Sequence, residues 1–425
     1  MTIVIFLGVL LGAMALGMPI AFALLASGVA LMFHLDMFNN QIVAQNLVNG
    51  ADNFPLMAVP FFILAGELMN AGGISKRIIN FAMALFGHVK GGLGYVAILA
   101  SVIFAGLSGS AVADAAALGA ILIPMMVAAG YDRAQSGGLI AASSIIAPIL
   151  PPSIPMIIFG VTAGVSITKL FMAGIIPGLL IAVVLTISWW SITRKGNFKV
   201  QPKKSFKEIM QAFLAASWAL FLPVLIIGGL RGGIFTPTEA AVVSAVYSLI
   251  VGLFIYREIN LKKVYHLLVA ASKTTSVVMF LAAAAMVSAW LITVANIPAE
   301  LADVLGPLIE NKVLLILAIN LLVLLVGTAM DLTPTILILT PVLMPIIEMA
   351  GIDPIFFGLI FILNNCVGLL TPPVGTVLNV VAGVGKLSME QIMKGVWPFL
   401  VVETLLLLIL SLFPDLVLIP LGWFT

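Results

Sequence analysis

The fold is decided by two stretches, Ala147-Pro148-Ile149-Leu150-Pro151-Pro152-Ser153 and, 221 residues further on, Gly368-Leu369-Leu370-Thr371-Pro372-Pro373-Val374. Each places a Pro-Pro pair inside an otherwise apolar run. Proline breaks a helix because it has no N–H and its ring clashes with the preceding turn. In lipid, the freed backbone groups need hydrogen bonds from protein or from a polar cavity. Two such breaks in corresponding positions indicate the binding site of a transporter near the membrane midplane.

The spacing of 221 residues recurs along the chain and indicates an internal duplication. It joins Pro124 to Pro345, Gly130 to Gly351, Asp132 to Asp353, Gly164 to Gly385, Gly174 to Gly395 and Pro177 to Pro398. The two halves are therefore expected to hold the same kinds of element in the same order.

The composition is that of a polytopic membrane protein. Hydrophobic residues make up 62% of the 425 residues and charged residues 8%, against about 25% charged in a typical soluble domain; the mean hydropathy is +1.26. This length suits about a dozen membrane segments of ~20 residues and leaves no room for a sizeable soluble domain. No Lys or Arg precedes Lys76, so the first apolar run is predicted to be a retained span and not a signal peptide.

The expected fold is all-α, with two re-entrant helical hairpins and two broken helices. Hairpin one, 93–129, turns at 106–110, and hairpin two, 313–350, turns at 327–331; a span broken at its Pro-Pro pair follows each. The apolar segments are expected at 3–33, 55–70, 93–107, 112–129, 136–150, 154–165, 170–193, 213–230, 239–256, 275–295, 313–326, 335–350, 356–370, 374–384 and 395–412.

The orientation follows from the basic residues. With re-entrant hairpins and one crossing for each broken segment, the chain crosses the membrane about nine times. A cytoplasmic N-terminus then places every Lys and Arg on the cytoplasmic side except Lys169, Arg231 and Lys312, as the positive-inside rule favours. Because an odd number of crossings separates corresponding elements, the repeat is predicted to be inverted.

The duplication predicts four parts of the chain. They are an N-terminal scaffold span (1–35), a first repeat of arm, span, hairpin one, broken helix and span (36–193), a cytoplasmic loop with scaffold spans (194–258) and a second repeat of the same kind (259–425). Segments 38–53 and 259–273 hold matching places, and we expect them to lie along the membrane interface as amphipathic arms. Ordinary surface loops are the alternative.

The hairpin tips and helix breaks carry backbone groups that suit ions. Half-helix ends expose carbonyls, which attract cations, or N–H groups, which attract carboxylates. Sodium takes about five or six oxygen ligands, which carbonyls and a hydroxyl provide without a charged side chain. We expect one sodium ion between each tip and its break, held near Gly106, Ala147 and Leu150 in the first half and near Gly327, Gly368, Thr371 and Val374 in the second. The alternative is that these small residues serve only close helix packing.

Acidic residues at membrane depth need a partner or a wet cavity, because an ionised aspartate costs about 2.5 to 3.5 kcal/mol there. Asp331 in tip two is the candidate for a binding site, and it is also placed to cap the following helix. Asp114 is expected either in the site or bonded to the backbone of its own hairpin. Glu67 is interpreted as interfacial and Glu403 as a contact with another subunit. The histidines do not suggest a metal cluster.

Five motifs in chain order carry a family resemblance. They are Leu107-Ser108-Gly109-Ser110-Ala111-Val112-Ala113-Asp114, Ile149-Leu150-Pro151-Pro152-Ser153-Ile154-Pro155, Phe235-Thr236-Pro237-Thr238-Glu239-Ala240-Ala241, Met330-Asp331-Leu332-Thr333-Pro334-Thr335 and Leu370-Thr371-Pro372-Pro373-Val374-Gly375. Together they resemble the large membrane subunit of TRAP transporters, the tripartite ATP-independent periplasmic transporters, over essentially the whole chain.

The resemblance implies an elevator in the bacterial inner membrane. A transport domain with both hairpins and both broken helices would slide against a scaffold while sodium drives uptake. A periplasmic binding protein would deliver the carboxylate substrate, and a separate four-span membrane subunit would complete the permease. Carried over by the motifs, Ser108, Ser110, Ser153 and Asp331 are expected near the substrate. General likeness favours a sialic acid or related sugar acid, with C4-dicarboxylates and keto acids as alternatives.

Two functions from other classes are considered. The run Gly106-Leu107-Ser108-Gly109 fits the nucleophile motif of an intramembrane serine protease. Such an enzyme needs a general base within hydrogen-bond reach, and the histidines are not expected at that depth. A sodium-independent channel is the second alternative, and the duplicated closed hairpins argue against it. The sequence indicates no phosphate-binding loop and no nucleic-acid partner. The expected function is transport and not catalysis.

Overall fold

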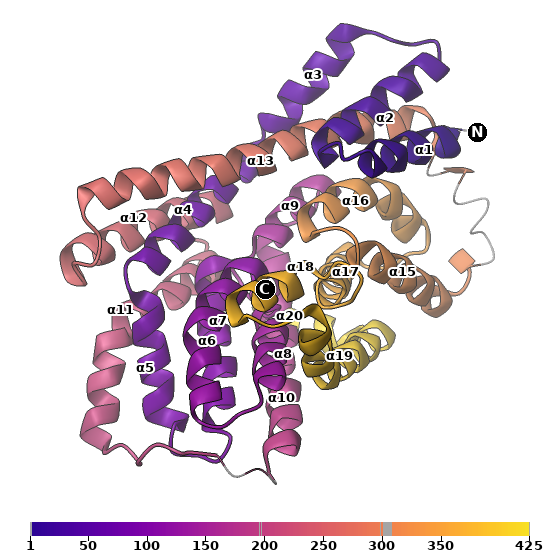
Figure 1. The fold of residues 1–425 in the computed structure, drawn as a ribbon. Helices are drawn as coiled ribbons and strands as arrows, with labels where there is room; N and C mark the ends of the chain where they lie inside the picture. The colour runs from indigo at the N-terminus through magenta and orange to yellow at the C-terminus, as the bar shows by residue number, and fades with distance from the viewer. Residues whose placement is uncertain (1, 195, 197, 298, 301–307, 425) are drawn as a thin grey trace.

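The computed structural model describes residues 2–194, 196, 198–297, 299–300 and 308–424, and in these residues all regular structure is helical (Figure 1). Eight helices are long and apolar enough to cross a membrane, judged by length and composition. The predicted class, an all-α polytopic membrane protein with two hairpins and two broken helices, is confirmed. Lys195, one of the basic residues predicted on the cytoplasmic side, lies outside the described residues.

The first half runs from the N-terminus through hairpin one and the first broken helix. Its elements are α1 (Thr2–Ala15), α2 (Ile20–His34), α3 (Asn40–Ala51), η1 (Phe54–Met57), α4 (Ala58–Ala71), α5 (Ile74–Phe86), α6 (Gly92–Ser108), α7 (Ala111–Ala128), α8 (Arg133–Ser144), α9 (Ile154–Ala163) and α10 (Ile167–Thr193). Helices α6 and α7 form hairpin one, and α8 and α9 are the two parts of the broken helix.

The second half repeats this order. Its elements are α11 (Phe206–Arg231), α12 (Pro237–Ile250), η2 (Val251–Ile255), α13 (Leu261–Val294), α15 (Lys312–Gly327), α16 (Leu332–Met349), α17 (Pro354–Gly368), α18 (Thr376–Gly385), α19 (Met389–Leu412) and α20 (Asp415–Phe424). Helices α15 and α16 form hairpin two, α17 and α18 are the broken helix, and α19 corresponds to α10.

The structure differs from the predicted segments at four places, one of which is the additional C-terminal helix α20. The run 3–33 is divided into α1 and α2, because Gly17 adopts a φ of 84° and Pro19 follows it. Helix α5 was not predicted, since Lys76 and Arg77 lower its hydropathy; it is amphipathic and buries its apolar side. The second predicted arm is not a separate element, because α13 continues from Leu261 to Val294 without a break.

Matching caps start the broken helices in the two halves. Asp132 caps α8 by accepting a hydrogen bond from the backbone N–H of Gln135 at 2.9 Å. Asp353, 221 residues later, caps α17 by accepting from Ile355 and Phe356, each at 2.9 Å. Because a cap satisfies donors that have no partner within the helix, both broken helices begin at a position that is set by the duplicated aspartate.

Glycines let helices of the two halves meet backbone to backbone. A Cβ added to Gly395 on α19 would lie 1.9 Å from the carbonyl oxygen of Ala134 on α8, and one on Gly138 would lie 2.2 Å from Gly395. A Cβ on Gly174 of α10 would lie 2.1 Å from the carbonyl oxygen of Ile149 in the first break. Small residues permit this close packing, so the duplicated Gly174 and Gly395 both serve contacts around the broken helices.

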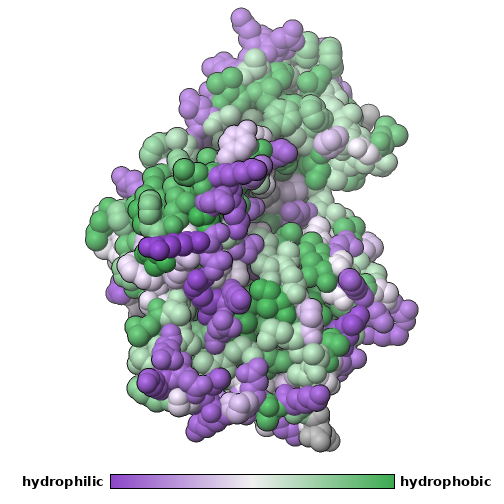
Figure 2. All heavy atoms as spheres, turned by 60° about the vertical axis from the view of Figure 1, so that its left-hand side comes forward, coloured by the Kyte–Doolittle hydropathy of each residue, from purple (hydrophilic) through white to green (hydrophobic). Residues whose placement is uncertain are grey.

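Helix α13 runs across the upper part of the molecule, above helices that stand roughly upright in Figure 1. It packs against α2, α3, α4 and α16. Figure 2 shows that much of one face is hydrophobic, with hydrophilic side chains gathered at its upper and lower ends and in a band across its middle. A hydrophobic exterior suits contact with lipid.

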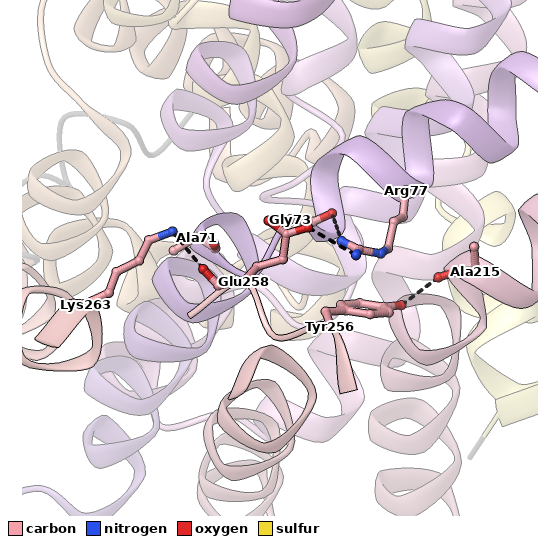
Figure 3. A network of polar contacts seen from close by, with 7 residues as sticks. All are labelled: Ala71, Gly73, Arg77, Ala215, Tyr256, Glu258 and Lys263. Carbon is pink, nitrogen blue, oxygen red and sulfur yellow. Dashed lines mark hydrogen bonds and ion pairs between the residues drawn. The ribbon is translucent and has the colours of Figure 1, made fainter. Parts of the chain in front are cut away.

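A polar network joins the α4–α5 junction to the start of α13 (Figure 3). Arg77 on α5 lies 3.1 Å from Glu258 Oε1 through its Nη2, and its Nη1 donates to the carbonyl oxygen of Gly73 at 2.9 Å. The guanidinium lies 3.9 Å from the ring centroid of Tyr256. Lys263 on α13 donates to the last carbonyl of α4 at 2.9 Å. The network therefore fixes how α4, α5 and α13 meet.

Candidate functional site

A cavity of about 320 Å³ lies where both hairpin tips meet α4, α5 and α13. Three of the four residues predicted near the substrate line it: Ser108, Ser110 and Asp331. The fourth, Ser153, is fully buried and is not part of the cavity wall. The hydroxyl of Ser153 donates to the carbonyl oxygen of Pro148 and accepts from the N–H of Met156 at 3.2 Å. Its structural place is therefore the cap of α9 behind the wall.

Tip one is organised by hydroxyl groups. Helix α6 ends at Ser108, Gly109 adopts a φ of 61°, and Ser110 caps α7 by accepting from the N–H of Ala113 at 3.4 Å. The Ser108 hydroxyl donates to Asp114 Oδ1 and accepts from the N–H of Ser110 at 3.2 Å. Of the two places expected for Asp114, the structure puts it on the cavity wall; it bonds to the side chain of Ser108 and not to the hairpin backbone.

The first tip is packed on the first break. A Cβ added to Gly109 would lie 2.7 Å from the carbonyl oxygen of Pro152. A Cβ on Gly106 would lie 2.7 Å from Pro223 of α11 and 3.8 Å from the carbonyl oxygen of Pro151. Ala147 and Leu150, predicted near sodium, are buried in the same break. The predicted ion-binding residues of the first half are therefore brought to one junction.

The second tip is packed on the second break in the same way. A Cβ on Gly368 would lie 2.8 Å from the backbone of Gly327. The carbonyl oxygen of Thr328 accepts from the N–H of Val374 at 3.1 Å, and the Thr371 hydroxyl donates to the carbonyl oxygen of its own helix at Val367, at 2.8 Å. The four residues predicted near sodium in the second half meet at this junction.

Asn365 on α17 is a polar residue of this junction that the sequence reasoning missed. It is fully buried, and neither its Oδ1 nor its Nδ2 has a hydrogen-bond partner among the described residues. A Cβ on Gly327 would lie 2.8 Å from Asn365 Oδ1. The residue 221 positions earlier is Ser144, so no asparagine pair marked the site in the sequence.

The described wall of the cavity carries acidic side chains but no Lys, Arg or His. The acids are Glu67, Asp114 and Asp331. Glu67, interpreted from the sequence as interfacial, lies on this wall, half-buried, and Asp331 is exposed on it. Asp331 caps α16 by accepting from the N–H of Leu332 at 2.9 Å, so its two expected roles are compatible.

Three helices begin at the cavity, and their N-terminal ends are its electropositive groups. The first residues of α7, α9 and α16 line the wall, among them Ala111, Ile154 and Leu332. Helix N-termini favour anions because their first N–H groups have no partner within the helix and the macrodipole is positive there. The cavity can therefore bind a carboxylate through backbone N–H and hydroxyl groups.

Glu403 differs from its predicted role. It was expected at a contact with another subunit, but it is only 1% exposed inside this chain. Its two carboxyl oxygens have no hydrogen-bond partner among the described residues. Among all the described residues, no group of three or more His, Cys, Asp or Glu side chains suits a metal ion.

Comparisons with known proteins point to one family. The family model described as "Tripartite ATP-independent periplasmic transporter, DctM component" matches residues 7–416. The chain is 56% identical over 423 residues to the 2,3-diketo-L-gulonate TRAP transporter large permease protein YiaN of Escherichia coli (strain K12), covering 100% of both chains. It is 42% identical over 405 residues to the sialic acid TRAP transporter large permease protein SiaM of Vibrio cholerae, covering 95% of each.

A solved structure shows a related fold. The YdaH transporter of Alcanivorax borkumensis, whose topology is described as unusual, matches with a TM-score of 0.65 at 16% identity. The match covers 90% of this chain and 88% of that one. At this identity the likeness concerns the fold alone.

Proposed function

The chain belongs to the TRAP transporter family as a large permease, and from that premise we propose that it imports a sugar acid of the 2,3-diketo-L-gulonate type, driven by sodium. The chain is a multi-pass membrane protein, and its relatives are transporter permeases and not enzymes. The proposed location is the bacterial inner membrane with the N-terminus in the cytoplasm.

The observation that carries the proposal is the polarity of the cavity. The Ser110 hydroxyl can donate to a ligand, whereas the Ser108 hydroxyl already donates to Asp114. Three helix N-termini supply electropositive backbone groups, and no Lys, Arg or His lies on the described wall. This combination suits a small carboxylate. The cavity of about 320 Å³ lies at the lower end of the usual range for ligand pockets and suits a six-carbon acid.

The choice of sugar acid follows from the relatives. The diketogulonate permease shares 56% of its residues with this chain and the sialic acid permease 42%. A diketogulonate-type substrate is therefore favoured over sialic acid, which the sequence alone had favoured. Sialic acid and C4-dicarboxylates remain alternatives.

Sodium is proposed at the two junctions between tip and break. Gly106, Ala147 and Leu150 would surround one ion, and Gly327, Gly368, Thr371 and Val374 the other. The charges on the cavity wall support this assignment, because three acids and a carboxylate substrate would repel one another without cations nearby. The wall offers no Lys, Arg or His among its described residues to fill that role.

The proposed mechanism is an elevator. The two hairpins and the two broken helices would move together against a scaffold that includes α4 and α13. The packing of each tip on its break supports a common rigid unit. A periplasmic binding protein would deliver the substrate, and a four-span membrane subunit would complete the permease, as expected for the family.

The test is uptake of labelled 2,3-diketogulonate into proteoliposomes that hold this chain and its small membrane partner, with the binding protein outside. We expect uptake that needs both an inward sodium gradient and the binding protein. Thr404→Ala is a control, since this hydroxyl only bonds to the carbonyl of its own helix at Leu400. Sodium-dependent uptake of sialic acid, without uptake of 2,3-diketogulonate, would contradict the proposed substrate. Uptake that does not change with the sodium gradient would contradict the proposed coupling to sodium.

A further inference from the structure

Glu67 is an acidic residue of the cavity wall on the helix that packs beside tip one. It is on α4, next to Gly66, and a Cβ added to Gly66 would lie 3.7 Å from the Cα of Ser108. Glu67 lines the same cavity as Ser108 and Ser110, on the part of the wall that α4 and α5 form. It is half-buried and makes no hydrogen bond or ion pair with any described residue. Its carboxylate is therefore available to a ligand.

The cavity wall combines groups that attract an anion with acidic side chains. Three helix N-termini and the Ser110 hydroxyl can hold a single anionic group, although Asp331 caps one of these helices. The wall from α4 and α5 offers Glu67, Asn70 and Ser75, of which Ser75 donates to Asn70 Oδ1 at 3.0 Å. These groups suit substrate hydroxyls, because a carboxylate accepts hydrogen bonds from them.

A second substrate carboxylate would meet acidic side chains and no basic side chain on the described wall. Asp114, also on the wall, is 1% exposed, and its Oδ2 has no partner among the described residues. No basic side chain on the described wall offsets Glu67. Like charges brought together without compensation are a common means of rejecting a wrong ligand.

We propose that Glu67 is a specificity-determining residue that admits hydroxylated monocarboxylates and rejects dicarboxylates. The inference rests on the proposed function, because it assumes that the cavity binds a sugar acid. It goes further by naming the side chain that selects between one carboxylate and two within the permease itself, in addition to any selection by the binding protein.

The experiment measures direct binding to the purified chain with its small membrane partner, in sodium and without the binding protein. The probes are gulonate and glucarate, which differ only in that a terminal CH₂OH of gulonate is a carboxylate in glucarate. We expect the wild type to bind gulonate at least about tenfold more tightly than glucarate. In Glu67→Gln this preference should fall to about threefold or less, through tighter binding of glucarate. Glu348→Gln removes an exposed acid that is not on the cavity wall, and it should leave the preference unchanged.

The outcomes separate the inference from its premise. If the wild type prefers gulonate and Glu67→Gln keeps the full preference, the role of Glu67 is overturned while the proposed function stands. An equal shift in Glu348→Gln would also overturn it, since net charge alone would then explain the effect. If the wild type binds neither probe nor 2,3-diketogulonate, the proposed function falls and the inference falls with it.

Discussion

Hairpin one and hairpin two use the same pair of groups in exchanged positions. In tip one the helix cap is the hydroxyl of Ser110 and the acid is Asp114, four residues on; in tip two the cap is Asp331, and the hydroxyl is Thr335, four residues on. Asp114 is buried and bonded to Ser108, whereas Asp331 is exposed on the cavity wall. The exchange shows how one backbone plan buries the acid of one tip and exposes the acid of the other, while both line the cavity.

The largest expected effect on stability comes from adding a side chain to Gly109 in tip one. Gly109→Ala should lower the free energy of unfolding by about 2 to 4 kcal/mol, because φ is 61° and the new Cβ would meet the carbonyl of Pro152. Thermal unfolding of the purified protein in detergent measures this. Gly383→Ala, where a Cβ meets nothing within 4 Å, is the matched control. Equal stability of the two variants would show that tip one is not held against its break.

Removing the acid of tip two should affect transport more than folding. Asp331→Ala is expected to reduce uptake about tenfold to a hundredfold, as the loss of a hydrogen bond to a charged group would, and to cost about 1 kcal/mol of stability as a lost cap. Proteoliposome uptake and thermal unfolding measure the two effects. Ser110→Ala, the cap of tip one, should likewise impair uptake. Normal uptake by both variants contradicts the assignment of the tips to the site.

A double-mutant cycle tests whether Asp114 organises tip one. Ser108→Ala and Asp114→Asn should each lower the free energy of unfolding, with a coupling energy of about 1 kcal/mol because the two side chains share a hydrogen bond. The comparison cycle in tip two is Asp331 with Thr335, where the Thr335 hydroxyl bonds to the backbone carbonyl of Asp331 and not to its carboxylate. Additive effects at Ser108 and Asp114 would argue against their bond.

The smallest expected effect concerns Asn365 at the second junction. Asn365→Ala should raise the sodium concentration for half-maximal uptake by about threefold to tenfold, if its amide oxygen helps to hold the ion. Ser144→Ala is the matched change in the first half, where the hydroxyl is already bonded to the carbonyl of Ala141 at 2.7 Å. A sodium dependence equal to that of the wild type would exclude Asn365 from the site.

Local rules explain which elements were predictable. The tips and the breaks follow from glycine and proline at a constant offset, and their effects on the backbone are local. Helix α5 escaped prediction because Lys76 and Arg77 lie on a helix that buries only one side. The division of residues 3–33 into α1 and α2 was not predicted either. The run is apolar throughout, so its hydropathy shows no boundary, and only its glycine and proline indicate one.

The candidate site divides in the same way. Ser108, Ser110 and Asp331 were predicted on tips that the structure brings to one cavity. Ser153 is a member of the matching motif, but its hydroxyl is used within the break and does not reach the wall. Glu67 and Asn365 were missed because neither has an equivalent residue in the other half.

The sequence by itself determined the all-helical membrane class, the duplication, the two hairpins and the two breaks, because composition, proline, glycine and spacing act through nearby backbone. Only the tertiary structure decided which side chains share the cavity. Glu67 shares the cavity with tip one because α4 packs beside Ser108, and Asn365 meets tip two because Gly327 and Gly368 bring α15 onto α17. Such contacts depend on how helices far apart in the chain pack, which no local pattern specifies.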